Sequence, residues 1–421
     1  MTTFLTRFRH ECLHPIQSQL MEEGQDVLYS IETEQAIGRF EVEPMEFSTS
    51  HETLDAADAA WADVADLMVR VALRYQHQST ATVANINPVA MPVLRLATIL
   101  VEYYRASLSF SQGPSSDRWV PLMLHALGFY LSTAPYTTTE CTAACQAILD
   151  ALPPLVHLRH SGDDAIPSTD ALFPRYLSRV LSFFASKSSK DDWVKTLSAP
   201  PFAFRWYLLL VPSLSSDMLG RVLALALPLL DQDTCSTQVV GLDVVHHAIR
   251  AATPTDVRWY TDLLLHEMEG TLTVATTSPA FLAATLRCLQ DLLAIVSVQH
   301  DVRHYDRFFP SLLRAWDMAL DVPVKSALTV GIRPLVRAMG APHSLHLCVY
   351  LQPLLKVTLG CLASPGELQV EGLETLRVVV LACWVRMALH VEDITLALLR
   401  YKYAHVDHHL CRRSWMINNG M

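Results

Sequence analysis

Few residues of this sequence have the types and spacing that chemistry requires. The run HEME at 266–269 begins like the zinc-binding pattern H-E-x-x-H, but the second histidine is missing. The phosphate-binding patterns G-x-x-x-x-G-K-[ST] and G-x-G-x-x-G are absent, as is the nucleophile turn G-x-S-x-G. We therefore predict a protein without catalytic residues and without a bound cofactor.

Histidine is concentrated at two further places. The run HVDHHLC puts His405 one helical turn before His408 and His409, but a metal ion needs three or four converging ligands with supporting contacts. We interpret this run as a solvated helix end and predict no metal site, with metal binding as the alternative. His246 and His247 are adjacent on an expected helix and point about 100° apart, so one can pack inside while the other faces outward.

The composition argues against several classes of protein. Hydrophobic residues make up 51% of the 421 and charged residues 18%, which excludes a disordered chain. The longest apolar runs, Val222–Leu230 and Val378–Val385, are too short to span a bilayer. The nine cysteines are scattered without a C-x-x-C pair, so we expect buried thiols in a reducing compartment. We predict a cytoplasmic protein, with the nucleus as a second compartment left open.

The net charge of −10 lies at one end of the chain. Residues 1–66 hold 14 acidic and 3 basic residues, while the remainder is close to neutral. This balance excludes a polybasic nucleic-acid binder, and the basic runs at 303–307, 400–405 and 411–415 hold few cations. We predict neither nucleic acid nor membrane as a partner. We interpret residues 1–52 as an acidic, partly flexible and solvated segment, with a partner-binding arm as the alternative.

Apolar spacing indicates helices along most of the chain. Leu282, Leu286, Leu289, Leu293 and Val296 follow steps of three and four residues, which places them on one helix face. Strand signals are scarce, so we predict an all-α protein. Prolines and polar turns separate the helices expected at 55–78, 92–109, 119–132, 139–152, 201–211, 217–231, 235–252, 256–272, 279–297, 302–320, 323–340, 343–362, 367–388 and 391–404.

The helices expected in the second half form a repeat. Successive pairs start at 217, 256, 302 and 343, and these spacings match a HEAT or armadillo unit of roughly 40–47 residues. We predict a right-handed superhelical α-solenoid of HEAT/armadillo-like helix pairs. Its expected parts are N-terminal helical repeats at 53–160, a loop or linker at 161–170, a C-terminal solenoid at 171–404 and a tail at 405–421.

Several motifs occur in an order typical of one family. They are RWYLLLVPSL (205–214), LALPLLDQD (225–233), GLDVVHHAI (241–249), LRCLQDLL (286–293), RAMG (337–340) and LACWVRMALHVEDITLALL (381–399). Over about residues 171–404 the sequence resembles the Tel-two-interacting protein 2 family. The most specific element is the last motif, with its Cys383, Trp384 and Arg386.

The resemblance implies a non-enzymatic scaffold or co-chaperone subunit of the Tel-two complex. Family members join Tel-two and Tel-two-interacting protein 1 and work with the heat-shock chaperone machinery. Together they stabilise newly made phosphatidylinositol-3-kinase-related kinases, which serve DNA-damage and growth signalling. Solenoids suit this role because they offer long surfaces to other helical proteins. A generic armadillo/HEAT adaptor of the karyopherin type, acting in transport, is the alternative.

Seven residues within these motifs are candidates for partner binding or for the core of the motif. We expect Trp384 to fill the core between the last two helices and Arg386 to satisfy a helix end, with direct partner contact as the alternative. Val385 stands where the family commonly has proline, so a straighter last helix is expected. The seven candidates are Trp206, Asp231, Gly241, His246, Trp384, Arg386 and His390.

Overall fold

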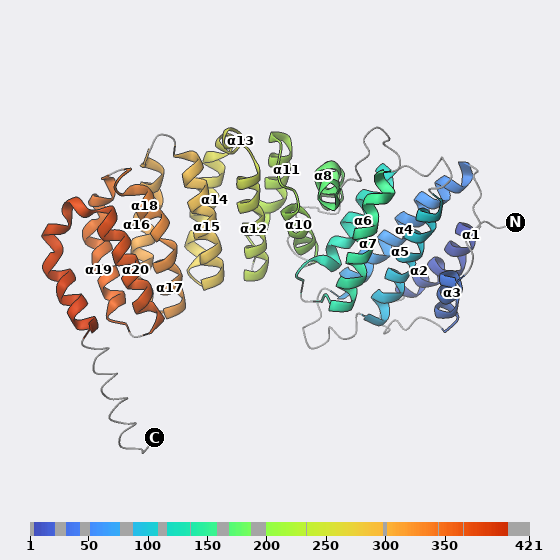
Figure 1. Cartoon of the computed structure of the whole chain (residues 1–421), viewed down its shortest axis with the longest axis horizontal. Helices are drawn as coiled ribbons and strands as arrows, with labels where there is room; N and C mark the ends of the chain where they lie inside the picture. The colour runs from blue at the N-terminus through green and yellow to red at the C-terminus, as the bar shows by residue number, and fades with distance from the viewer. Residues whose placement is uncertain are drawn as a thin grey trace, which may run out of the picture. The chain divides into compact units, whose positions relative to one another are not determined.

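The computed structural model shows two compact units, Met1–Gln232 and Asp233–Met421 (Figure 1). The regular secondary structure of the described residues is helical, which confirms the all-α prediction. The structure describes residues 4–21, 31–42, 51–75, 87–107, 116–134, 136–157, 168–186, 199–232, 234–297, 301–343, 345–364 and 366–402.

Helices of the second unit begin at prolines and polar caps. Pro254, Pro279 and Pro323 each lie in the first turn of a helix, where a backbone N–H has no partner within the helix. The Thr253 hydroxyl accepts a hydrogen bond from the backbone N–H of Asp256 at 3.2 Å. The elements are α12 (Cys235–Ala251), α13 (Pro254–Trp259), α14 (Thr261–Ala275), α15 (Pro279–Val296), α16 (Arg303–Met318), α17 (Val322–Gly331), α18 (Arg333–Met339), η5 (His346–Tyr350), α19 (Leu351–Leu362), α20 (Glu367–Ala382) and η6 (Trp384–His390).

Most expected helix boundaries in this unit are confirmed to within a few residues. The differences are breaks inside four expected helices. The helix expected at 343–362 consists of the 3-10 turn η5 followed by α19. The helix expected at 256–272 starts earlier and is divided at Tyr260, and the one at 323–340 is divided at Ile332, just before Pro334. The one at 367–388 ends at Ala382. A last helix covers residues 391–402.

Two layers of helices form the second unit. Helices α12, α15, α17 and α20 pack in sequence within one layer (Figure 1). Helices α14, α16 and α19 lie against α15, α17 and α20 and form the other layer. Each repeat thus contributes one helix to each layer and contacts its neighbouring repeats, which is the arrangement of an α-solenoid. The prediction of a solenoid of HEAT-like helix pairs is confirmed.

An apolar helix, α15, lies in the middle of this stack. It is long and apolar enough to cross a membrane by length and composition alone. It nevertheless contacts α12, α14 and α17, and its Phe281, Leu289 and Leu293 are buried. Packing between neighbouring helices therefore accounts for its composition.

The first unit is also layered. Helix α6 packs on α4 and α10, α5 packs on α3 and α7, and α8 contacts α6, α7 and α10. The Tyr130 hydroxyl donates to the Met68 carbonyl at 2.7 Å and so joins α6 to α4. The elements are α1 (Phe4–Phe8), η1 (Arg9–Leu13), α2 (His14–Met21), α3 (Ile31–Val42), α4 (His51–Tyr75), α5 (Asn87–Ser107), α6 (Ser116–Leu131), α7 (Thr139–His157), α8 (Thr169–Ser186), α10 (Ala199–Leu209), α11 (Ser216–Ala226) and η3 (Leu227–Leu229).

The N-terminal segment is packed over its described residues 4–21 and 31–42. Phe8 and Phe40 are fully buried, and their rings meet edge to face with 5.7 Å between centroids. The interpretation of residues 1–52 as a solvated segment is therefore wrong for these two stretches. Apolar residues at helical spacing, rather than net charge, decide their burial.

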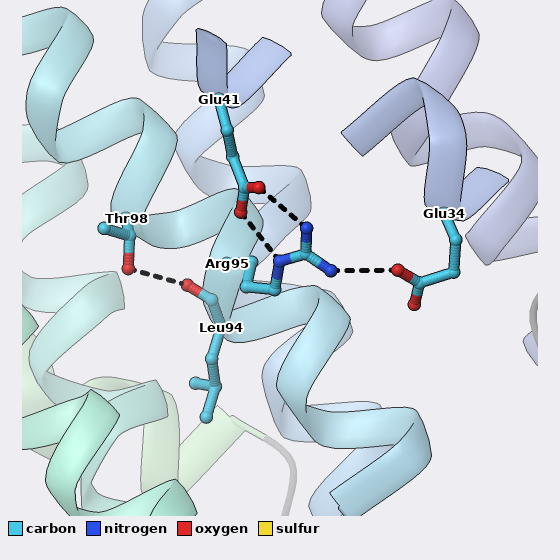
Figure 2. Close-up of polar contacts among 5 residues, drawn as sticks. All are labelled: Glu34, Glu41, Leu94, Arg95 and Thr98. Atoms are coloured by element: carbon cyan, nitrogen blue, oxygen red, sulfur yellow. Dashed lines mark hydrogen bonds and ion pairs between the residues drawn. The ribbon is translucent and has the colours of Figure 1, made fainter. Parts of the chain in front are cut away.

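Basic residues of the first unit pair with its acidic side chains. Figure 2 shows Arg95 of α5 between two carboxylates of α3. Its Nη1 donates to Glu34 at 2.9 Å, and its Nε and Nη2 donate to Glu41 at 2.7 Å each. Arg9 of η1 lies 2.7 Å from a carboxylate oxygen of Asp63 on α4. Part of the local acidic excess is thus neutralised by contacts between helices.

The cysteines have the environments expected of small apolar residues. Six of the eight described cysteines are buried, and Cys235 and Cys348 are half-buried. Burial raises the pKa of the Cys288 thiol to about 12. Most of the expected linker at 161–170 and the whole tail at 405–421 lie outside the described residues.

Candidate functional site

The last described helices of the second unit leave apolar side chains exposed. After α20 the chain turns at Cys383, passes through η6 and continues as the helix over 391–402. We call the exposed large apolar residues of this region the C-terminal apolar surface. They are Leu381, Trp384, Val385, Leu389, Val391, Leu396, Leu398 and Leu399.

Trp384 belongs to this surface and not to the core. Its side chain is 66% exposed, so the expectation that it fills the core between the last two helices is wrong. The Ala382 carbonyl accepts from the N–H of Ala341 at 2.8 Å, and the N–H of Arg386 donates to the Cys383 carbonyl at 2.9 Å. The α-helical bond between Ala382 and Arg386 is therefore replaced by a 3-10 bond.

The same bonds decide the end of α20. The Ala382 carbonyl is bonded to Ala341 instead of to Arg386, and α20 ends there, with Cys383 in a non-helical conformation. The expectation of a straighter last helix from Val385 is therefore wrong. Burial raises the pKa of the Cys383 thiol to about 12, and the neighbouring Cys348 adds to that shift.

A groove of about 1320 Å³ lies between α19 and the helix over 391–402. We call it the C-terminal groove. Leu355, Leu359 and Leu362 line it from α19. The residues that line it from η6 and the last helix are Leu389, His390, Asp393, Leu396, Ala397, Arg400 and Tyr401.

Three sequence candidates lie together at this end of the chain. Trp384 and Arg386 are exposed on η6, and His390, at the end of η6, is half-buried and lines the C-terminal groove. Apolar side chains line the groove together with polar ones such as Lys356 and Gln369, and such a mixture suits a helix of another protein.

Two further candidates lie on α12, in contact with neighbouring repeats. Gly241 is buried in this helix. His246 Nε2 lies 2.8 Å from Oδ2 of Asp291 on α15, and Arg250 approaches the same carboxylate at 3.8 Å. His246 thus joins adjacent helices of one layer.

The last two candidates belong to the first unit. Trp206 of α10 is half-buried, and its ring meets Phe173 of α8 edge to face with 5.6 Å between centroids. A Cβ added at Gly128 of α6 would lie 3.2 Å from the Trp206 ring, so this glycine lets α6 and α10 approach closely. Asp231 is exposed beyond η3.

The polar clusters elsewhere hold helices together. His346 Nε2 lies 2.6 Å from Oδ1 of Asp306, and the Tyr350 hydroxyl donates to the same oxygen at 2.8 Å. One carboxylate of α16 therefore fixes both side chains of η5. Within the described part of the chain, no group of three or more His, Cys, Asp or Glu side chains is placed to hold a metal ion.

The leucines and valines of the C-terminal apolar surface were not among the candidates from the sequence. A signal for it is present in the sequence. Val391, Leu396 and Leu398 lie on more than one face of their helix, so the apolar stripe is wider than packing on a single neighbouring layer requires.

Comparisons with known proteins give structural matches alone. No protein-family model and no curated protein matches the sequence. Kap121p bound to Pho4p matches with a TM-score of 0.49 and 13% identity, over 91% of this chain and 37% of that chain. The karyopherin Kap121p bound to the SUMO protease Ulp1p matches with a TM-score of 0.48 and 14% identity, over 95% of this chain and 40% of that chain. The chain thus spans about two fifths of the length of these proteins.

Proposed function

We propose that the protein is a non-enzymatic scaffold and co-chaperone subunit of the Tel-two complex, which assembles and stabilises newly made phosphatidylinositol-3-kinase-related kinases. The C-terminal apolar surface carries the proposal, because it lies in the 381–399 run that most resembles the Tel-two-interacting protein 2 family. Its partners in this proposal are Tel-two and Tel-two-interacting protein 1 homologues, together with the heat-shock chaperone machinery, in the cytoplasm.

Repeats of an α-solenoid bury their apolar side chains against neighbouring repeats. A group of large apolar side chains that is left exposed therefore needs another explanation. In this chain Leu389 is 77% exposed and Trp384 is 66% exposed. Such a surface supports the docking of a helical partner, which would bury these side chains.

Co-purification of the full chain from native cells tests the proposal. We expect mass spectrometry to find Tel-two and Tel-two-interacting protein 1 homologues in stoichiometric amounts, with kinases of the phosphatidylinositol-3-kinase-related class in lower amounts. The absence of both would overturn the proposal. A GTP-loaded small GTPase as the stoichiometric partner would favour the transport adaptor instead.

Two tryptophan variants locate the docking surface in the same experiment. Trp384→Ala should lose the partners while its circular dichroism spectrum stays that of the unaltered protein. Trp259→Ala is the matched control, because this tryptophan of α13 is 82% exposed and lies outside the C-terminal apolar surface. Equal partner recovery by both variants would contradict docking through Trp384.

A further inference from the structure

The helix over 391–402 carries its charges in a fixed order along the C-terminal groove. Asp393 lines the groove near the start of the helix, and Arg400 lines it two turns later. Leu396 and Ala397 line the groove between them. We call these four residues the stripe. Along the helix the stripe begins with an acidic side chain, continues with two apolar ones and finishes with a basic one.

These charges are exposed and available for a partner. Asp393 and Arg400 make no hydrogen bond or ion pair with any residue in the described ranges. Glu392 and Lys402, also exposed, repeat the same order on the helix. The acidic residues in the first turn complement the helix dipole.

The stripe is complementary to itself when reversed. If a second copy of the helix lies antiparallel across the first, Asp393 of each copy faces Arg400 of the other. The two-fold axis then passes beside Leu396 and Ala397, and the small side chain of Ala397 lets the two backbones approach. One self-complementary patch on both subunits is what a symmetric dimer requires.

We propose that the C-terminal groove binds a second copy of this chain, through antiparallel packing of the two helices over 391–402. The dimer buries Leu389 and Leu396 of both copies, which are otherwise exposed, and its two symmetry-related ion pairs set the register. Because the dimer covers part of the C-terminal apolar surface, it competes with the partner of the proposed function but does not depend on it.

Sedimentation of the purified full chain over a range of concentrations tests the dimer. We expect a reversible monomer–dimer equilibrium. Arg400→Glu and Asp393→Arg should each raise the dimer dissociation constant about tenfold or more, because both ion pairs become like-charge contacts. The double variant Asp393→Arg with Arg400→Glu restores complementarity and net charge, so it should dimerise like the unaltered chain. Arg314→Glu, at an exposed position of α16, controls for a change of charge alone.

Two results would overturn the proposal. One is a chain that stays monomeric up to about 100 µM. The other is a double variant that dimerises no better than the single variants. Neither result bears on Tel-two binding. Absence of the Tel-two partners at a concentration at which the chain is monomeric would contradict the proposed function alone.

Discussion

The guanidinium of Arg95 holds the carboxylate of Glu41 through two hydrogen bonds of 2.7 Å, one from Nε and one from Nη2 (Figure 2). The residues belong to α5 and α3, so the pair fastens the acidic N-terminal helix to the body of the first unit. The hydrogen bond from Arg95 lowers the pKa of Glu41 below its ordinary value.

We expect α3 to loosen in acid for this reason. Because the pKa of Glu41 is lowered in the folded state, the stabilisation is complete above the pKa of an unfolded glutamate. It is lost as the pH falls through the lower folded value. Amide hydrogen exchange of α3, followed from neutral pH into acid, measures the loss. Arg95→Gln should remove most of the pH dependence, and an unchanged dependence in this variant would contradict the assignment.

Truncation of Phe40 should destabilise the first unit. Phe40 is 0% exposed and lies among Phe4 and Phe8, with ring centroids 5.2 and 5.7 Å away. Phe40→Ala should lower the free energy of unfolding by about 3–5 kcal/mol, because it leaves a cavity. Urea unfolding followed by tryptophan fluorescence measures it. Gln35→Ala on the exposed face of α3 should change stability by less than about 0.5 kcal/mol, and equal effects would show that α3 is not packed.

Two glycines should respond to alanine with opposite signs. A Cβ at Gly340 would lie 2.9 Å from the Ala382 Cα and the Val336 carbonyl oxygen, so the backbone has to shift. Gly340→Ala should lower stability by about 1–3 kcal/mol. A Cβ at Gly270, within α14, meets nothing within 4 Å, so Gly270→Ala should raise stability by about 0.5–1 kcal/mol. Calorimetric melting of both variants measures these changes in stability. A stabilising Gly340→Ala would contradict the close packing at Ala382.

Truncation of a buried tryptophan of the second unit should cost more folding free energy than truncation of an exposed one. Trp316 is 0% exposed, and its Nε1 donates to the Thr329 hydroxyl at 3.0 Å. Trp316→Ala should cost about 3–5 kcal/mol of folding free energy. Trp384→Ala should cost less than about 1 kcal/mol, because it removes exposed surface. Chemical denaturation measures the free energy of unfolding of both variants. A strongly destabilised Trp384→Ala would show that Trp384 belongs to the core.

Helices were predictable wherever their signals are local. Pro279 begins α15, and Leu282, Leu286 and Leu289 lie on its buried face at the spacing that predicted the helix. A proline at a helix start and an apolar stripe act within one element. The repeat of helix pairs followed from the same signals, because each pair has the same two-helix pattern.

What the sequence did not reveal depends on contacts between distant residues. At the end of α20 the Ala382 carbonyl accepts from Ala341, a residue of a distant segment, and the exposed Trp384 follows two residues later. Packing of the acidic N-terminal helix depends on Arg95, which is 54 residues from Glu41. The spacing of residues within one helix does not predict contacts between residues so far apart in the sequence.

Reconstituted binding tests the central claim that the C-terminal apolar surface is where a helical partner docks. The full chain, Trp384→Ala and Trp259→Ala would each be titrated with the purified Tel-two and Tel-two-interacting protein 1 homologues in a calorimeter. We predict that the full chain and Trp259→Ala bind with the same affinity and that Trp384→Ala binds at least about tenfold more weakly. Equal affinity of all three would contradict the claim.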